Sequence, residues 1–412
     1  MKHLPYPGSH RILLLVGIFI LMTPSCAPAL QTVPTPPASA PASQARPVDT
    51  ATSAPVLQDT LTPTQAPTAA PTRPTQPVVV AHYCLLADCS HYQYPGDFLS
   101  GNMGGIDGVM LVLLDQIWTA AYPQGIQEWD PHDGHLINSI SANYEVGNFM
   151  DIQYDGKLIW ASQYVPTSTS DSYRVFYAID PLQGKLVKKI SLKYGENDYH
   201  SFLFGVSPGK VWLEQQWIDT NTFQIHDASH YFACPDQHFA YDGQGLLWVT
   251  GDVIPDLTCD RYLYVWNASD PNGQPLPSDT HDAFSDSPLV MANGKMWMMT
   301  QKEVKSKSGW EKHWILTAFD LKDATKPVIQ VDISQYMPEL NGDLIMAADN
   351  KAIWVVPDDI KGDVEYFDQA DGSYLGSLHV GQLIEGMGFD GSSLWVMDNE
   401  HGLEQIALPW AP

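Results

Sequence analysis

The chain has 412 residues, 44% of them hydrophobic, and a formal net charge of −26. Only 21 residues are Lys or Arg against 47 Asp or Glu, so the sequence lacks the basic excess that phosphate backbones require, and nucleic acid is excluded as an expected partner. The sequence also contains no zinc-protease helix, phosphate-binding loop, dinucleotide fingerprint or EF-hand loop, which excludes the enzyme classes that these motifs mark.

The N-terminus carries an export signal. Lys2 and Arg11 precede the apolar run Ile12 to Met22, which has the length of a signal-peptide core and is too short for a typical membrane span. We therefore predict that residues 1–26 direct export of the chain.

Cys26 is a candidate for lipidation. Thr23-Pro24-Ser25-Cys26 resembles the bacterial lipoprotein signal, in which a small residue precedes the modified cysteine, although Thr23 stands where that family usually has Leu. The resemblance implies a membrane anchor on Cys26 and a location at the cell surface or envelope. The alternative is ordinary cleavage at Ala27-Pro28-Ala29, which would release a soluble secreted protein.

Residues 27–76 form a linker. They contain no Gly, Phe, Tyr or Trp and are dominated by Pro, Thr, Ala, Ser and Gln, so they cannot bury enough apolar surface to fold. Proline at this density favours polyproline II, and about 50 residues at about 3.1 Å each would reach up to about 150 Å. We predict a disordered stalk.

Residues 77–412 are predicted to form one all-β domain. Seven times an apolar residue precedes a tryptophan, at intervals of 36 to 57 residues, which is the length of one four-stranded propeller blade. The sequence therefore predicts a seven-bladed β-propeller, with these tryptophans in the core: Trp118, Trp160, Trp212, Trp248, Trp297, Trp354 and Trp395.

Turn residues repeat with the same period. Asp-Gly or Asn-Gly pairs such as Asp155-Gly156 precede the tryptophan strands, as expected of tight hairpins. A second half-repeat, Asp followed four residues later by Gly, occurs at Asp130, Asp180 and Asp368. This pattern resembles the outer hairpin of the YVTN and quinoprotein-like propeller superfamily over residues 100–408. The resemblance implies the propeller fold and leaves the ligand open. The blades lack the tryptophan that docks quinone in quinoproteins, so bound quinone is not expected.

The last repeat ends at Leu408, after what would be its third strand. We predict that Val78–Tyr83 supplies the fourth strand and closes the ring, with Trp410 over the seam. Trp310 lies in the charged insertion Lys302–His313, Trp314 directly follows it, and both are expected at the surface. Gly205-Val-Ser207-Pro-Gly209 matches a nucleophile elbow in letters only, because a strand and not a helix follows it.

The five cysteines leave Cys26 unpaired. We expect two disulfides, in keeping with an oxidising compartment, and the alternatives are reduced thiols or a metal site with His82, His91 and His238. The expected pairs are Cys84 with Cys89 and Cys234 with Cys259.

Polar residues at the entrances of the inner strands are predicted to face the central channel. Carboxylates, amide oxygens and imidazoles in a ring could hold Ca²⁺ or Mg²⁺, as in propellers similar to gluconolactonases; the alternative is a water-bonded polar ring. His200, His238 and Glu385 are similar in residue type to the His and Glu set of virginiamycin B lyase. The ring candidates are Asp107, Asn148, Asp151, His200, His238, Asp286, Asp343 and Glu385.

Three functions follow as hypotheses. The leading one is a non-enzymatic, monomeric propeller, tethered outside the cytoplasm, that binds a protein, glycan or small ligand through its cysteine-bearing loop face. The second is a metal-dependent lyase or lactonase, with His200, His238 and Glu385 as candidate catalytic residues and Asp107, Asn148, Asp286, Asp343 and Glu385 as candidate ligands. The third is a structural role in envelope assembly.

Overall fold

The structure is a computed structural model. It describes residues 74–83, 108–113, 115–122, 124–166, 172–194, 204–213, 216–227, 238–251, 262–270, 287–305, 309–337, 344–358, 361–398 and 402–411. They belong to one compact unit, Ala70–Pro412. The predicted signal peptide, Cys26, most of the linker and the four cysteines of the predicted disulfides lie outside the described residues. Within the described ranges, we find no helix with the length and hydropathy of a membrane span.

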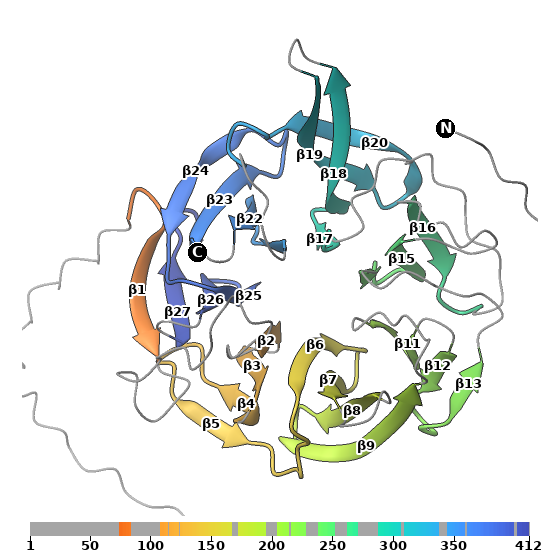
Figure 1. The fold of residues 1–412 in the computed structure, drawn as a ribbon. Coiled ribbons are helices and arrows are strands. Elements are labelled where there is room, and N and C mark those ends of the chain that lie inside the picture. The colour runs from red at the N-terminus through yellow and green to blue at the C-terminus, as the bar shows by residue number, and fades with distance from the viewer. Residues whose placement is uncertain are drawn as a thin grey trace, which may run out of the picture. The chain divides into compact units, whose positions relative to one another are not determined.

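The described residues form seven antiparallel sheets arranged as the blades of a propeller, which confirms the predicted fold (Figure 1). Blade 1 contains β2 (Gly108–Leu113), β3 (Gln116–Ala121), β4 (Gly125–Trp129) and β5 (Leu136–Ser139). Blade 2 contains β6 (Asn148–Tyr154), β7 (Ile159–Pro166), β8 (Ser172–Asp180) and β9 (Lys185–Tyr194). Blade 3 contains β10 (Gly205–Ser207), β11 (Lys210–Trp212), β12 (Gln216–Asp219) and β13 (Ile225–Asp227).

Blade 4 has three strands among the described residues, β14 (Phe239–Tyr241), β15 (Leu246–Gly251) and β16 (Tyr262–Asn267). Blade 5 contains β17 (Val290–Ala292), β18 (Lys295–Lys305), β19 (Trp310–Asp320) and β20 (Asp323–Asp332). Blade 6 contains β21 (Ile345–Ala348), β22 (Ala352–Asp358), β23 (Asp363–Asp368) and β24 (Tyr374–His379). Ser207 ends β10 and a hairpin leads directly to β11, so the elbow-like sequence is a strand turn, as predicted.

Blade 7 is built from both ends of the domain. Its strands β25 (Ile384–Phe389), β26 (Ser393–Asp398) and β27 (Gly402–Ala407) are completed by β1 (Val78–Tyr83), in the order β1-β27-β26-β25. The β1–β27 register runs from Val78 opposite Ala407 to Tyr83 opposite Leu403. The predicted ring closure is confirmed, and it pairs an edge of β27 that would otherwise be open.

Seven apolar clusters hold the ring together, one at each junction between neighbouring blades. Each cluster contains one of the seven predicted tryptophans, and each of these side chains is at most 2% exposed. Trp118, for example, packs with Phe149 and Tyr177 between blades 1 and 2. The prediction that these residues form the core is confirmed, and stability is shared among the blade junctions.

In several blades an acidic turn residue anchors the tryptophan. In blade 2, Asp155 accepts hydrogen bonds from the Lys157 and Leu158 amides, 2.7 Å each, and from Trp160 Nε1 at 2.9 Å. Asp349 and Asp390 do the same in blades 6 and 7. One carboxylate thus closes the hairpin and satisfies the buried indole.

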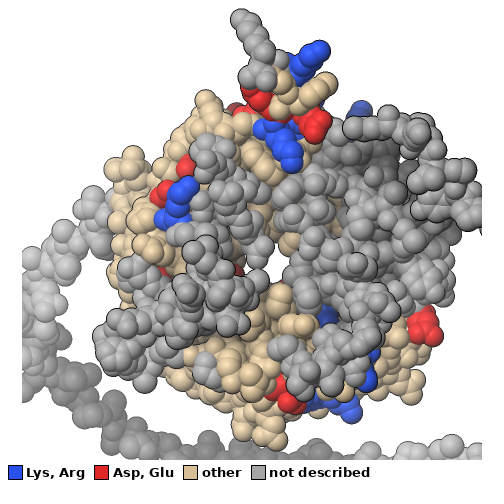
Figure 2. Space-filling view, viewed as in Figure 1, with Lys and Arg blue, Asp and Glu red and all other residues tan. Residues whose placement is uncertain are grey.

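The three remaining tryptophans of interest differ from one another. Trp410 Nε1 donates to Asp349 Oδ2 at 3.1 Å and its ring stacks with Trp354, so it lies against blade 6. Trp310 is 69% exposed, as expected, whereas Trp314 is partly buried against the junction of blades 5 and 6. The β18–β19 hairpin that carries both extends outward from the rim, and basic and acidic side chains gather on it (Figures 1 and 2).

Candidate functional site

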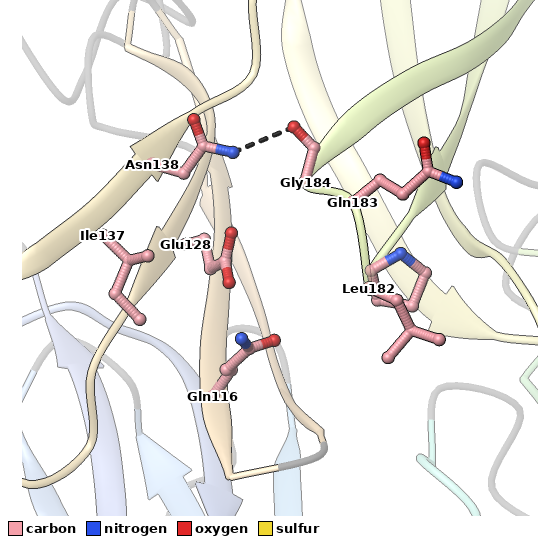
Figure 3. A pocket seen from close by; sticks show the side chains of 8 residues that line it. Gln116, Glu128, Ile137, Asn138, Leu182, Gln183 and Gly184 are labelled. Atoms are coloured by element: carbon pink, nitrogen blue, oxygen red, sulfur yellow. Dashed lines mark hydrogen bonds between the residues drawn. The ribbon is translucent and has the colours of Figure 1, made fainter. Parts of the chain in front are cut away.

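A pocket of about 350 Å³ lies where blades 1 and 2 meet (Figure 3). Blade 1 contributes residues from β3, β4 and β5, and blade 2 contributes the turn between β8 and β9. The pocket therefore opens on the face of the ring where tight turns join first to second and third to fourth strands. We call it the Glu128 pocket; its lining consists of Gln116, Glu128, Ile137, Asn138, Pro181, Leu182, Gln183 and Gly184.

Glu128 occupies a position that is apolar in most other blades. It lies opposite Trp118 in the β3–β4 register, and it is only 5% exposed. The residues opposite the corresponding tryptophans of the other blades are Ala178, Trp217, Val265, Ala318, Tyr366 and Gln405. Burial of a carboxylate at this position costs desolvation energy. Glu128 is therefore a departure from the pattern of the repeat that packing does not explain.

The blade 2 turn closes the far side of the pocket. Asn138 Nδ2 donates to the Gly184 carbonyl oxygen at 2.8 Å, and in Figure 3 Glu128 and Asn138 both extend toward Gly184. Gly184 has φ +57°, and a Cβ there would lie 2.2 Å from Asn138 Nδ2 and 3.2 Å from Glu128 Oε2. Glycine is thus required both by the backbone and by the approach of the two side chains.

Burial raises the pKa of Glu128 above its usual value, and hydrogen bonds from the side chains of Asn138 and Gln116 offset only part of this effect. Trp118 Nε1, at the same blade junction, finds no hydrogen-bond partner among the described residues. The pocket therefore combines an incompletely solvated carboxylate with carboxamide groups. Leu182 and Ile137, 87% and 44% exposed, add apolar surface at its mouth.

This arrangement suits binding of a small polar ligand. A carboxylate accepts hydrogen bonds from hydroxyl or ammonium groups, and carboxamides both donate and accept. The volume lies at the lower end of the range of small-molecule sites. Sequence reasoning missed this pocket; the signal that could have found it was the acidic residue in a position that is apolar in most repeats.

The predicted axial ring is only partly within the described residues. Asp107, His200, Asp286 and Asp343 lie outside them. Asn148 begins β6, His238 directly precedes β14 and Glu385 lies in β25, so these three residues lie in or next to the inner strands of blades 2, 4 and 7. The metal ring and the lyase set of His200, His238 and Glu385 stay predictions.

Asp151 has surroundings unlike those of a solvated axial carboxylate. It accepts hydrogen bonds from Gln153 Nε2 at 2.7 Å and from the Phe204 amide at 3.3 Å, at the junction of blades 2 and 3. Burial raises its pKa to about 6, against the lowering effects of these bonds and of Arg174. Its hydrogen bonds join neighbouring blades, so we assign it a structural role.

One group of potential metal ligands occurs elsewhere in the described part of the chain. The ligand atoms of Asp130, Asp133 and His135 lie within 4.8 Å of one another on the exposed turn between β4 and β5. Asp133 Oδ1 and His135 Nδ1 are 2.5 Å apart. This group was not among the predicted ligands; the side chain of Asp133 bonds to that of His135, and the carboxylate of Asp130 bonds to His132.

No family model matches the sequence, and no curated protein matches it. Solved structures resemble the fold at low identity. BamB from Moraxella catarrhalis shares 10% identity at a TM-score of 0.39 over 74% of this chain and 83% of its own. Hydrazine synthase of Kuenenia stuttgartiensis shares 9% identity at a TM-score of 0.48, over 74% of this chain and 96% of its own. A chain of a mitotic checkpoint complex shares 9% identity at a TM-score of 0.49, over 88% of this chain and 99% of its own. At these values the likenesses carry no information about a ligand.

Proposed function

We propose that this chain is an exported binding protein, tethered to the envelope through its N-terminus, whose propeller holds a small hydrogen-bond-donating ligand in the Glu128 pocket. The observation that carries the proposal is Glu128 itself. Burial takes water away from this carboxylate, the hydrogen bonds from Asn138 and Gln116 offset the loss only in part, and a ligand that donates a hydrogen bond could supply the rest.

Binding is favoured over catalysis by the chemistry of the lining. The eight lining residues include one carboxylate and no histidine, cysteine, serine, lysine or arginine, so the pocket has no nucleophile and no acid/base pair. The leading hypothesis from the sequence placed the ligand on the cysteine-bearing loop face. The proposed site lies at the tight turns between β2 and β3 and between β8 and β9, and the four cysteines lie outside the described residues.

The proposed ligand carries a primary ammonium group or several hydroxyl groups. An ammonium would pair with ionised Glu128 while the amides of Gln116 and Asn138 fix its orientation. Because the ionised carboxylate is the binding form, affinity for an amine should fall when the pH drops through the raised pKa of Glu128.

The test is saturation-transfer NMR with a panel of primary amines and monosaccharides. For Glu128→Gln we expect amine affinity to fall about tenfold or more, because a hydrogen bond to a charged group is lost. Glu303→Gln removes the same charge from an exposed site in β18 and should leave binding unchanged. Equal binding by wild type and Glu128→Gln would reject the site.

A further inference from the structure

The outer part of the β18–β19 hairpin is the most protruding element of the described ring (Figure 1). Both strands have 11 residues. In β18, Met296–Thr300 are buried and Lys302–Lys305 are exposed, and in β19 the order is reversed, from exposed residues at Trp310 to buried ones at Leu316. We call residues 302–305 and 310–313 the blade 5 arm. β17 pairs with β18 only at Lys295–Trp297, and β20 pairs with β19 only from Ile315 onward, so neither strand accompanies the arm.

The strand register places aromatic and basic residues on one face of the arm. Lys305 pairs with Trp310, and Glu303 pairs with Lys312, so these four side chains share a face. Trp310 and Lys305 form the outermost described pair. The outer end of the arm therefore presents an indole beside an ammonium group.

Folding does not explain why Trp310 is where it is. The seven repeat tryptophans are at most 2% exposed, whereas Trp310 is 69% exposed. A two-stranded ribbon without a neighbouring strand also adds little stability of its own. One exposed apolar side chain does not by itself indicate a binding surface, so we consider Trp310 together with the lysines that share its face.

The arm differs in charge from the rest of the chain. Its described residues include three lysines and two glutamates, in a chain of net charge −26. From Gln301 to Lys305 the ribbon rises about 13 Å, which exceeds the Debye length of about 8 Å at physiological ionic strength. The basic end of the arm can therefore attract an anionic surface even though the body of the protein would be repelled by it.

We propose that the blade 5 arm docks on an anionic lipid bilayer, with the Trp310 indole at the headgroup level and Lys305 and Lys312 near lipid phosphates. Tryptophan is enriched at membrane–water interfaces, and lysines near the surface add electrostatic attraction. A specific protein interface needs about 800 Å² from each partner, which the narrow end of a ribbon does not supply. The proposal is independent of the Glu128 pocket and of lipidation at Cys26.

The experiment is co-sedimentation of residues 70–412 with lipid vesicles. This unit contains all seven blades and all seven apolar clusters, so it is expected to fold alone. The probes are vesicles of phosphatidylcholine alone and vesicles of equal parts phosphatidylcholine and phosphatidylglycerol. We expect binding to the second kind only, reduced by added salt.

Variants of the arm show whether vesicle binding depends on the arm or on the overall charge of the protein. Each neutralisation, Lys305→Gln or Lys312→Gln, should weaken binding to anionic vesicles about fivefold. Trp310→Ala should weaken it further, with an unchanged melting temperature because the side chain is outside the core. The control, Lys185→Gln with Lys188→Gln, removes two charges from exposed positions of β9 and should have no effect.

Three results would overturn the proposal. One is failure of the wild-type unit to bind anionic vesicles, and another is equal binding by wild type and the arm variants. The third is binding of immobilised polyglutamate, lost in the arm variants, without binding of vesicles, which would assign the arm to an acidic protein partner.

Discussion

Blades 1 and 2 are neighbours with the same repeat pattern, and they use it differently. In blade 2, Asp155 accepts the Trp160 indole N–H, and the residue opposite Trp160 is the small apolar Ala178. In blade 1, the Trp118 indole has no described acceptor, and the residue opposite it is the acidic Glu128. The repeat decides where these positions lie, whereas the residue at each position decides whether it stabilises the blade or forms a site.

The largest expected effect comes from removing the anchor of blade 2. Asp155 is 4% exposed, so Asp155→Ala leaves two turn amides and the buried Trp160 indole without their acceptor. We expect a loss of about 3 kcal/mol in the free energy of unfolding, measured by urea denaturation.

Asp242→Ala is the matched control for that variant. Asp242 accepts from the amides of its turn, Gln244, Gly245 and Leu246, while the blade 4 tryptophan, Trp248, has no described acceptor. Both carboxylates accept three hydrogen bonds, but Asp242 is only half-buried and accepts from turn amides alone, so its loss should be smaller by about 1 kcal/mol. Equal losses would show that the indole bond adds nothing.

The second expected effect concerns the wall of the Glu128 pocket. Gly184→Ala introduces a Cβ 2.2 Å from Asn138 Nδ2, whereas Gly294→Ala, at a similar φ of +70°, meets nothing within 4 Å. Both variants carry the backbone strain of about 1 kcal/mol, and the steric conflict should cost Gly184→Ala about 1 kcal/mol more. Calorimetric unfolding measures both, and equal destabilisation would contradict the described packing.

The third effect depends on pH. The pKa of Asp151 is raised to about 6, so in the window between about pH 4 and 6 the folded state binds more protons than the unfolded state. Wild-type stability relative to Asp151→Asn should therefore fall as pH rises through this window. Above it, Asp151→Asn should be more stable by up to about 3 kcal/mol, and at lower pH the two should converge. A pH-independent difference would refute the assignment.

The smallest effect is expected from removing divalent ions. Because the proposed pocket has one carboxylate, ligand binding there needs no metal, and chelation should leave the melting temperature unchanged. Plasma mass spectrometry before and after chelation provides the check. A stoichiometric Ca²⁺ or Mg²⁺ whose loss lowers stability would instead support the axial ring predicted from Asp107, Asn148, Asp286, Asp343 and Glu385.

The fold was predictable because its signals are local and repeated. A tryptophan and a tight turn in each repeat set the number of blades, and a last repeat one strand short implied that Val78–Tyr83 completes it. The Glu128 pocket was not predictable in this way. It exists only because the turn at Gly184 lies beside Glu128, and that contact between two blades has no period in the sequence.

The arm shows an intermediate case. The insertion Lys302–His313 was visible as a charged break in the repeat. Of the two tryptophans predicted at the surface, Trp310 is exposed and Trp314 is partly buried. Its strand pairing was not anticipated, because an alternation of charged and aromatic residues fits a solvated loop as well as a ribbon. Only the register of Lys305 opposite Trp310 places these side chains together.

The most direct measurement is a crystallographic soak of residues 70–412 with the panel of primary amines and monosaccharides. We predict ligand density in the Glu128 pocket, with an ammonium or hydroxyl group within hydrogen-bonding distance of the Glu128 carboxylate and no such density in Glu128→Gln crystals. Ligand density confined to the central channel or the opposite loop face, with the pocket empty in every soak, would contradict the assignment of the site.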